Sequence, residues 1–340
     1  MAGFYIITVR DDLRPRFQPE LHDQDKRPTR CPACGYDGPE HSKPSAEAGF
    51  ELLDCPDCGL GRTWPPVPGS EIGKWYPEQY YGKTNVRFNA LFERMIRWFR
   101  WRRAAVLHNR VPRGPVLDVG CGRGMTLAFL RELGYESHGL ELSETAAAHA
   151  RDVLKLDVAT GDFLTSPHEK NRYNAVIFHH SLEHFANPVA AVARAYELLK
   201  PGGVLFIAVP NYGSWQARLF GRFWFHVDAP RHYWHFTIKS LDAILARHRF
   251  RVVQLDHFSF EQNPYGLLQS MFNAAGFRFN LLYSLLKNST ARTDTALRYP
   301  VQSLLHAALL PFLVPFVVAA TVLETAFKSG GTFEMYAFKE

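Results

Sequence analysis

Cysteine is scarce in this sequence of 340 residues, which contains five, and a secreted disulfide framework is therefore not expected. Four of the five form two Cys-x-x-Cys pairs, and the fifth, Cys121, lies in a glycine-rich segment. This usage is typical of a reducing compartment and a metal site. The N-terminal region also lacks the basic stretch, apolar run and small-residue cleavage site of a signal peptide. We therefore expect a cytoplasmic protein.

A strong excess of either charge is also absent. The net charge is +6, and 46% hydrophobic and 21% charged residues indicate a globular chain rather than a disordered one. A modest positive charge suits a membrane surface, a phosphate-bearing substrate or nucleic acid without selecting among them. Residues 114–260 contain no clustered Lys/Arg stripe, so nucleic acid is not the expected partner.

Apolar runs from residue 114 onward alternate between strand and helix patterns. The expected strands are Pro115–Val119, Ser137–Leu142, Ala175–Phe178, Val204–Val209, Val252–Phe260 and Thr332–Lys339. The expected helices are Met125–Leu133, Glu144–Val153, Val189–Leu199 and Ser240–Arg247. Strands that alternate with helices indicate βαβ units and a mainly parallel sheet, hence an α/β fold.

A glycine loop stands where the first of these strands meets its helix. Gly120, Gly122 and Gly124 allow a tight turn and a close approach of backbone to a ligand at a helix N-terminus. A purely structural turn or a dinucleotide site would use a similar loop. The third glycine comes one residue earlier than in the usual G-x-G-x-x-G of dinucleotide sites, which favours a different ligand.

Four later motifs stand at matching distances from this loop: Glu141 at the end of the next strand, Gly161-Asp162-Phe163, the segment 173–180, and Leu198-Leu199-Lys200-Pro201-Gly202-Gly203. With them, the chain resembles the class I methyltransferases that depend on S-adenosylmethionine (SAM). The resemblance implies a Rossmann-like seven-stranded sheet with helices on both faces, whose last strand is antiparallel and lies beside the fifth.

The same resemblance implies a set of cofactor-binding residues. Asp118, Gly120, Gly122 and Gly124 would line the methionine end of SAM, Glu141 would hold the ribose, and Asp162 with Phe163 would hold the adenine. Their neighbours Cys121, Leu142 and His179 complete the expected set.

Candidate catalytic residues follow the fourth strand, at the sheet edge where open α/β folds bind ligands. His180 and His184 can act as general bases near neutral pH. The segment resembles ubiquinone-pathway O-methyltransferases, in which a Glu-x-x-Glu-His pattern is associated with a metal; here His180 replaces the first acid, while Glu183 and His184 match. The sequence leaves two alternatives: a divalent metal bound by this segment, or a merely structural role for Glu183 and His184.

A second candidate region, Trp215–Phe236, follows the fifth strand and resembles a Pro-Arg-His segment of the same subgroup. We expect His232 to be the general base, and Arg231, Trp224 and Tyr233 to contact the acceptor. An aromatic lid packed for structure is the alternative.

The cysteine pairs predict a metal site. Cys31-Pro-Ala-Cys34-Gly and Cys55-Pro-Asp-Cys58-Gly resemble two knuckles that together bind one tetrahedral zinc ion. Four thiolates leave no open position, so we expect structural zinc; redox pairs are the alternative. A module of roughly forty residues has too small a hydrophobic core to fold without a bound metal or another cross-link.

Residues 301–323 carry no formal charge and are long enough to span a bilayer. If residues 330–338 rejoin a cytosolic sheet, a single crossing is excluded, and Pro311 and Pro315 disfavour a straight helix. We expect a hairpin with Tyr265–Phe272 or Leu281–Leu286. The arginine-rich segment 86–108, with Trp98 and Trp101, predicts a basic amphipathic helix, and the two features together favour peripheral contact with the inner face of a membrane. Ordinary core packing is the alternative.

The expected organisation has six parts: a poorly ordered segment 1–28, a zinc ribbon 29–68, a linker and basic helix 69–113, a SAM-binding core 114–260, an apolar helical insertion 261–329, and a last strand 330–340. The function these features favour is methyl transfer from SAM to an O, C or N atom of a lipid-linked, saccharide or quinone-like small-molecule acceptor. RNA methylation and an inactive SAM-fold scaffold are the alternatives.

Overall fold

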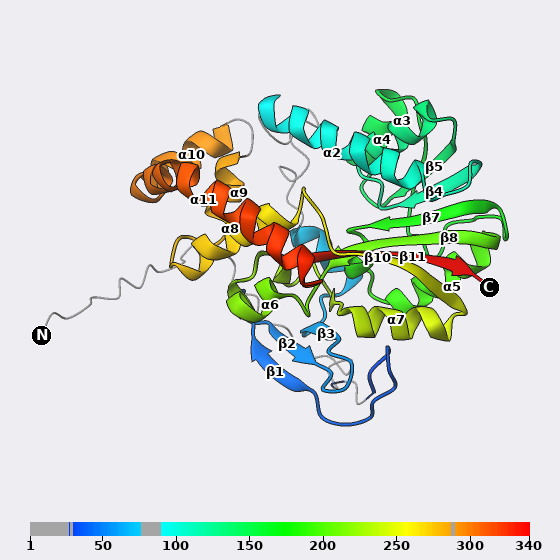
Figure 1. Ribbon diagram of the computed structural model, residues 1–340, viewed down its shortest axis with the longest axis horizontal. Coiled ribbons are helices and arrows are strands. Elements are labelled where there is room, and N and C mark those ends of the chain that lie inside the picture. Colours follow the sequence, from blue (N-terminus) through cyan, green and yellow to red (C-terminus); the bar gives the residue numbers. More distant parts are fainter. Residues whose placement is uncertain (1–26, 28–29, 76–89, 287–289) are drawn as a thin grey trace, which may run out of the picture.

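The computed structural model describes residues 27, 30–75, 90–286 and 290–340 (Figure 1). The segment 1–28 predicted to be poorly ordered lies outside the described residues except for residue 27, and so does the start of the helix predicted at 86–108. From residue 90 on, that helix is present as α2 (Ala90–His108).

A seven-stranded sheet forms the centre of the molecule. Its strands are β4 (Pro115–Val119), β5 (Glu136–Glu141), β6 (Asp157–Thr160), β7 (Tyr173–His179), β8 (Leu199–Pro210), β10 (Phe250–Asp256) and β11 (Thr332–Lys339), in the spatial order β10-β11-β8-β7-β4-β5-β6. β11 is antiparallel to both β8 and β10, and the other described pairs are parallel. The predicted α/β fold is therefore confirmed, including the antiparallel last strand beside the fifth.

The strand side chains alternate between two apolar layers because successive residues of a strand point to opposite faces. Leu117, Val176 and Ile207 pack on the side of α5 (Pro188–Leu198) and α7 (Ile238–Arg247). Val116 and Phe206 pack on the side of α2 and α3 (Met125–Glu132), and α4 (Glu144–Asp152) packs beside α3. Side chains cap several of these helices, with Ser143 accepting from Ala146 N and Thr237 forming a capping box with Ser240.

The cysteine-bearing segment forms a second, four-stranded sheet at the α7 side of the molecule (Figure 1). It contains β1 (His41–Pro44), β2 (Glu51–Asp54) and β3 (Gly61–Trp64), followed by α1 (Gly69–Ile72) and the 3-10 turn η2 (Gly73–Trp75). Its fourth strand, β9 (Trp234–His235), comes from the segment between β8 and β10 of the large sheet. The segment is therefore built into the rest of the protein by backbone pairing.

Helices follow the sheet strands in the C-terminal part. They are α6 (Trp215–Phe220), α8 (Asn263–Ala274), α9 (Leu281–Leu286), α10 (Thr290–Arg298) and α11 (Pro300–Ala326). α11 runs through Pro311 and Pro315 as one assigned helix, so the prolines do not break it. α8 and α9 pack against α11 through Leu268, Leu282 and Val317, as the expected hairpin required.

Two of the arginines of α2 depart from the expected solvent-facing basic surface, whereas Arg94 and Arg97 are exposed as expected. Arg100 and Arg103 both pair with Glu261, at 3.1 and 2.6 Å, and are mostly covered. Trp98 and Trp101 are about half exposed, at 49% and 52%. Neutralisation by Glu261 turns these two arginines inward, so the helix offers less positive charge to a membrane than its sequence indicates.

Candidate functional site

One cavity of about 1780 Å³ runs along the carboxyl ends of β4, β5 and β7. The strand order reverses between β4 and β7, and open α/β sheets bind ligands at such a switch point. One end of the cavity is lined by Gly120, Gly122, Glu141, Leu142, Asp162 and Phe163, the middle by His179, His180, Glu183, His184, His226 and His232, and the far end by Leu268, Leu282, Leu286, Leu310, Val314 and Val317. A loop of glycines, a group of titratable side chains and an apolar wall therefore share one space.

The glycine loop is shaped by backbone conformation. Gly120 has a φ of +78°, and a side chain there would lie 2.7 Å from Ser181 Cβ. Gly122 has a φ of +56°, and a Cβ there would meet nothing within 4 Å. Gly122 N donates to Glu141 Oε2 at 2.8 Å, and Ser143 N donates to Oε1 at 2.9 Å. Two backbone donors therefore fix the Glu141 carboxylate at the cavity wall, with lone pairs left for ligand hydroxyls.

Three of the predicted cofactor residues support this loop from behind and do not line the cavity. A Cβ on Gly124 would lie 2.7 Å from Leu156 and 2.9 Å from Ala150, so its role is close packing of α3 against α4. Cys121 packs with Leu127, and burial raises its pKa. Asp118 is buried, which raises its pKa to about 7 despite the charges of Arg103 and Arg100.

The other predicted cofactor residues do line the cavity. Asp162 accepts a hydrogen bond from Leu164 N at 2.6 Å, which orients its carboxylate. Phe163 is held edge-on by Phe178 and Phe185. His179 lies beside Phe206, and burial lowers its pKa well below the usual range, so the ring is neutral.

Glu183, His184 and His232 come together in the middle of the cavity, each with one potential ligand atom within 4.8 Å of the others. Glu183 and His184 belong to the 3-10 turn η4 (Leu182–His184) after β7, and His232 belongs to the loop before β9. Two stretches predicted separately as catalytic therefore form one cluster.

Backbone carbonyls set the tautomers of both histidines. His184 Nδ1 lies 2.9 Å from Arg231 O, and His232 Nδ1 lies 2.9 Å from His226 O. A carbonyl only accepts, so each Nδ1 carries the hydrogen, and the lone pair of each neutral ring is on Nε2. These Nε2 atoms can accept a proton or ligate a cation.

The environment of this cluster favours an ionised Glu183 beside a neutral His232. Burial would raise the pKa of Glu183, but the neighbouring His180, His184 and His232 outweigh it and hold the pKa at about 2. Burial lowers the pKa of His232 well below its usual range. His180 Nδ1 lies 3.4 Å from Glu183 Oε1, and its backbone is held at a φ of +51°.

A divalent cation fits the same donors. One carboxylate and two imidazoles form a common ligand set for divalent transition metals. No hydrogen bond of good geometry reaches either Glu183 oxygen within the described residues, so both have lone pairs to offer. The ligand set that the structure brings together includes His232, which the Glu-x-x-Glu-His comparison did not indicate.

Two of the three predicted acceptor-binding residues line the cavity, and the third does not. Arg231 and Tyr233 line the cavity; Arg231 Nη2 pairs with Asp228 at 2.5 Å, and the Tyr233 hydroxyl donates to Val67 O at 2.7 Å. Trp224 does not reach it. Its indole is 0% exposed among Leu52, Ala217 and Val227, so for this residue the packing alternative is correct.

Two charged residues of the cavity wall, Arg100 and Glu261, escaped prediction. They come from α2 and the loop before α8, and form an ion pair there. Nothing in the sequence relates positions so far apart, and the arginine pattern of α2 suggested solvent exposure instead.

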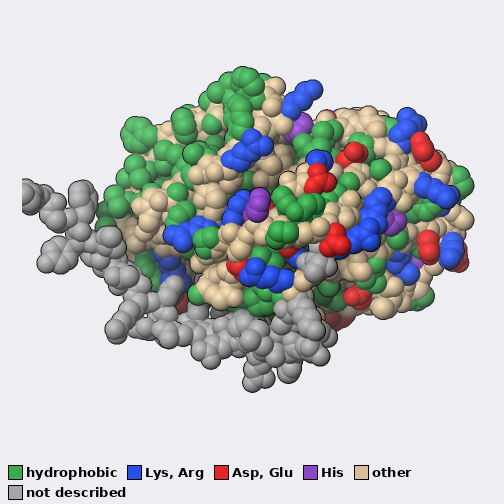
Figure 2. Space-filling view, turned by 90° about the horizontal axis from the view of Figure 1, so that it is seen from below, with side chains coloured by type: hydrophobic (Ala, Val, Ile, Leu, Met, Phe, Trp, Pro, Cys, Tyr) green, Lys and Arg blue, Asp and Glu red, His purple; other side chains and the backbone are tan. Residues whose placement is uncertain are grey.

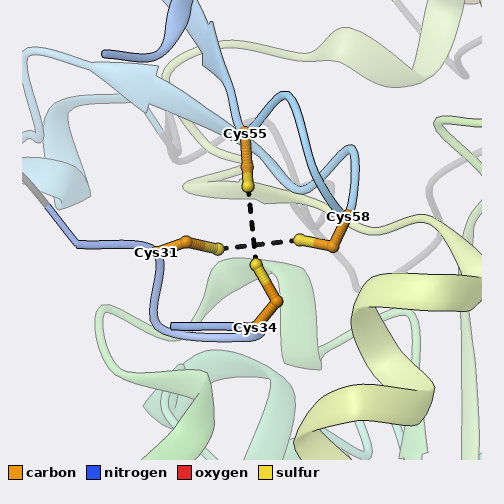
Figure 3. Close-up of side chains that lie close together, drawn as sticks. All are labelled: Cys31, Cys34, Cys55 and Cys58. Atoms are coloured by element: carbon orange, nitrogen blue, oxygen red, sulfur yellow. Dashed lines mark hydrogen bonds between the residues drawn. The ribbon is translucent and has the colours of Figure 1, made fainter. Parts of the chain in front are cut away.

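The four paired cysteines converge from two matched turns (Figure 3). Gly35 N donates to Cys31 O, and Gly59 N donates to Cys55 O, at 3.0 and 2.9 Å. The Sγ atoms of Cys31 and Cys58, and of Cys34 and Cys55, lie 3.6 Å apart. This spacing is far beyond a disulfide bond and close to the ~3.8 Å between sulfurs of a tetrahedral Zn–S4 site with bonds of about 2.3 Å.

Comparisons with known proteins point to a methyltransferase domain. Residues 91–255 match a family described as a methyltransferase domain. A ubiquinone biosynthesis O-methyltransferase of Thiobacillus denitrificans is 30% identical over 155 residues, covering 43% of this chain and 64% of that protein. One from Azoarcus is 32% identical over 102 residues, covering 28% and 44%.

A solved structure shares the fold. Phosphoethanolamine N-methyltransferase 2 of Haemonchus contortus, in complex with phosphomonomethylethanolamine and S-adenosylhomocysteine, superposes with a TM-score of 0.51 at 17% identity, covering 81% of this chain and 61% of that one. The chain spans less than half the length of several curated relatives that it matches, with 46%, 32% and 44% for three of them.

Proposed function

This chain belongs to the class I SAM-dependent methyltransferases, and from that premise we propose that it methylates a small molecule held beside Glu183, His184 and His232. The observation that carries the proposal is the single cavity joining the glycine loop to this cluster. SAM supplies a methyl group on a positively charged sulfur, which keeps the bonding electron pair after transfer. The remaining tasks, alignment and proton removal, fall to the side chains around the cavity.

For SAM, we propose a site at the end of the cavity formed by the glycine loop. Gly120 and Gly122 leave room above the loop for the methionine part, and Glu141 accepts hydrogen bonds from the ribose hydroxyls. Leu142, Asp162 and Phe163 border the adenine. Arg100, which pairs with Glu261 and whose charge acts on nearby Asp118, is a cation of the cavity wall that can also bind the SAM carboxylate.

For proton removal, we propose His232 Nε2 as the first candidate and His184 Nε2 as the second. The neutral His232 can accept the acceptor's proton, and the adjacent Glu183 carboxylate stabilises the imidazolium that results. Arg231 and Tyr233 border the acceptor on the same side. If a cation occupied the cluster instead, Glu183, His184 and His232 would hold it, and the cation would lower the pKa of an acceptor hydroxyl bound to it.

For the acceptor, we propose an amphipathic molecule with a polar head and an apolar tail, of the lipid-linked or quinone-like class. The wall that α8, α9 and α11 contribute is mostly aliphatic, with two tyrosines, Tyr265 and Tyr283, among the leucines and valines, and its apolar area suits a tail better than a free sugar. Burial of each methylene of a tail there stabilises the complex by about 0.8 kcal/mol.

We further propose that α11 touches a membrane. It is the one helix among the described residues that is long and apolar enough to cross a bilayer, with only 17% of its most apolar stretch buried. Hydrophobic side chains gather at the end of the molecule where α8–α11 lie (Figures 1 and 2). Because β11 follows α11 and pairs with β8, peripheral contact at the cytoplasmic face suits the fold better than a crossing.

For the cysteines, we propose one structural zinc ion. The test is metal analysis of the purified chain, with about one zinc expected per chain and little in Cys55→Ser. A wild-type chain that lacks zinc and still melts cooperatively would overturn this assignment.

The test of the function is transfer of label from [methyl-³H]SAM into fractions of a cell extract. We expect label in the chloroform-soluble fraction, and none with His232→Asn. Label confined to RNA would replace the proposal with RNA methylation, and tight SAM binding without label in any fraction would favour the scaffold alternative.

A further inference from the structure

The zinc ribbon reaches the proposed active site through Thr63. This residue lies in β3, only 3% exposed, where β3 pairs with β9. Its hydroxyl donates to His232 O at 2.6 Å and lies 3.1 Å from His235 Nε2, while its backbone N donates to Tyr233 O at 2.9 Å. One ribbon residue therefore holds two successive carbonyls of the loop that carries His232.

The opposite side of the same loop is held by the η4 turn. Tyr233 N donates to Glu183 O at 2.9 Å, and His184 Nδ1 bonds Arg231 O. The segment 231–233 is thus fixed between the ribbon and the residues that follow β7. Without the ribbon, the η4 contacts, the bond from His232 Nδ1 to His226 O and the bond from His232 N to Asp228 O would remain, and none of them holds the His232 and Tyr233 carbonyls.

We propose that Thr63 is a positioning residue for His232, and that the ribbon is a working part of the active site rather than a separate module. The proposal rests on the function proposed above for His232. A displacement of about 1 Å in a reacting group can cost on the order of a hundredfold in rate, so loss of the Thr63 hydroxyl acts on turnover. It leaves SAM binding intact, because the Thr63 hydrogen bonds found among the described residues reach His232, Tyr233 and His235 and not the glycine loop.

The test compares Thr63→Val, which keeps the shape and the backbone bond, with Thr63→Ser, which keeps the hydroxyl. The control is Arg247→Met, which removes another ribbon contact, from Arg247 Nη1 to Pro32 O at 2.9 Å, at α7 and away from the cavity. The measurements are initial rate of label transfer at saturating SAM, SAM affinity by calorimetry, zinc content and melting temperature.

We expect Thr63→Val to lower the rate about tenfold or more with unchanged zinc and SAM affinity, and Thr63→Ser and Arg247→Met to stay close to wild type. A rate within twofold of wild type for Thr63→Val overturns the proposal. So does an equal loss in Arg247→Met, because ribbon docking in general would then explain it.

A second readout does not need turnover. Diethyl pyrocarbonate modifies neutral imidazoles, and peptide mass spectrometry reports its rate at His232. We expect this rate to rise severalfold in Thr63→Val and not in Thr63→Ser. If no extract supports methyl transfer, the proposed function fails, but an unchanged His232 rate in Thr63→Val is what overturns the positioning role.

Discussion

At the residue scale, His232 and His248 differ in what their second ring nitrogen can do. His232 and His248 both place Nδ1 2.9 Å from a backbone carbonyl, but only His232 directs Nε2 toward an acid and another imidazole. A comparison of His232 with His248 therefore distinguishes the effect of the Nδ1–carbonyl hydrogen bond, which both share, from the effect of Nε2 in the cluster, which only His232 has.

We expect His232→Asn to lower the rate of methyl transfer by about 10²–10⁴-fold, the usual contribution of a general base, with SAM affinity unchanged. His248→Asn, at the end of α7, should leave the rate close to wild type. The measurement is label transfer with calorimetric SAM binding. Equal rates for the two variants would exclude a catalytic role for His232.

A comparison of two glycines distinguishes the loss of space for a ligand from the cost of backbone strain. Gly122 and Gly134 both have positive φ and open space around a built Cβ, but only Gly122 lines the cavity. We expect Gly122→Ala and Gly134→Ala to lose similar stability, on the order of 1 kcal/mol each, and only Gly122→Ala to weaken SAM binding, by tenfold or more. Calorimetry with SAM and urea unfolding check this; unchanged SAM affinity in Gly122→Ala would remove the loop from the binding site.

At the element scale, α11 carries the membrane proposal. Phe312 and Phe316 are 77% and 57% exposed, and charges there oppose insertion among lipid tails. We expect the double variant Phe312→Asp and Phe316→Asp to lose at least tenfold in affinity for vesicles of phosphatidylcholine and phosphatidylglycerol, measured by flotation, while SAM binding stays intact.

The control for α11 is Val153→Asp. Val153 is a 64% exposed apolar residue just after α4, beside β6 at the opposite edge of the sheet from β10. Flotation should be unaffected there. If the wild-type chain ignores vesicles, the apolar face of α11 has a different partner.

Most elements of the central sheet could be predicted, because each buried strand shows an apolar run and each helix a 3.6-residue repeat. β6 could not, because only Val158 of its four residues is buried. The pairing of β3 with β9 could not either, since β9 has two residues and joins segments far apart in sequence. Local patterns also mislead for α2, where Glu261 draws Arg100 and Arg103 inward.

The candidate site divides the same way. Gly122, Glu141 and the cysteines could be predicted because spacing along the chain sets their geometry. The grouping of His232 with Glu183 and His184, and the loss of Trp224 to the core, depend on how distant loops pack.

At the scale of the whole molecule, the change in folding stability as pH falls is a sum over buried titratable groups, some of which lower the stability and some of which raise it. Burial lowers the pKa of His226 to about 3, so the folded state excludes a proton that the unfolded chain binds near pH 6.5, and stability falls as pH drops below about 6.5. Asp118 acts oppositely, because its raised pKa makes the folded state bind a proton between about pH 4 and 7. The contribution of one group can therefore be measured only by comparing the wild type with a variant that lacks that group.

We therefore expect the difference in unfolding free energy between the wild type and His226→Asn to shrink by about 2 kcal/mol from pH 7.5 to pH 5. Urea unfolding at both pH values measures it, and Asp118 contributes equally to both chains. A difference independent of pH would mean that His226 is already charged in the folded protein.

The position of β11 has a consequence for how the chain folds. β11 is the common neighbour of β8 and β10, yet it is synthesised after α8–α11. Until then, both strands present unpaired edges while the apolar α11 is already made, and such edges are prone to wrong pairing. The sheet can close only through contacts of long sequence separation, which form slowly. The same arrangement that builds the apolar wall of the cavity thus leaves two strand edges open until the last residues of the sheet are made.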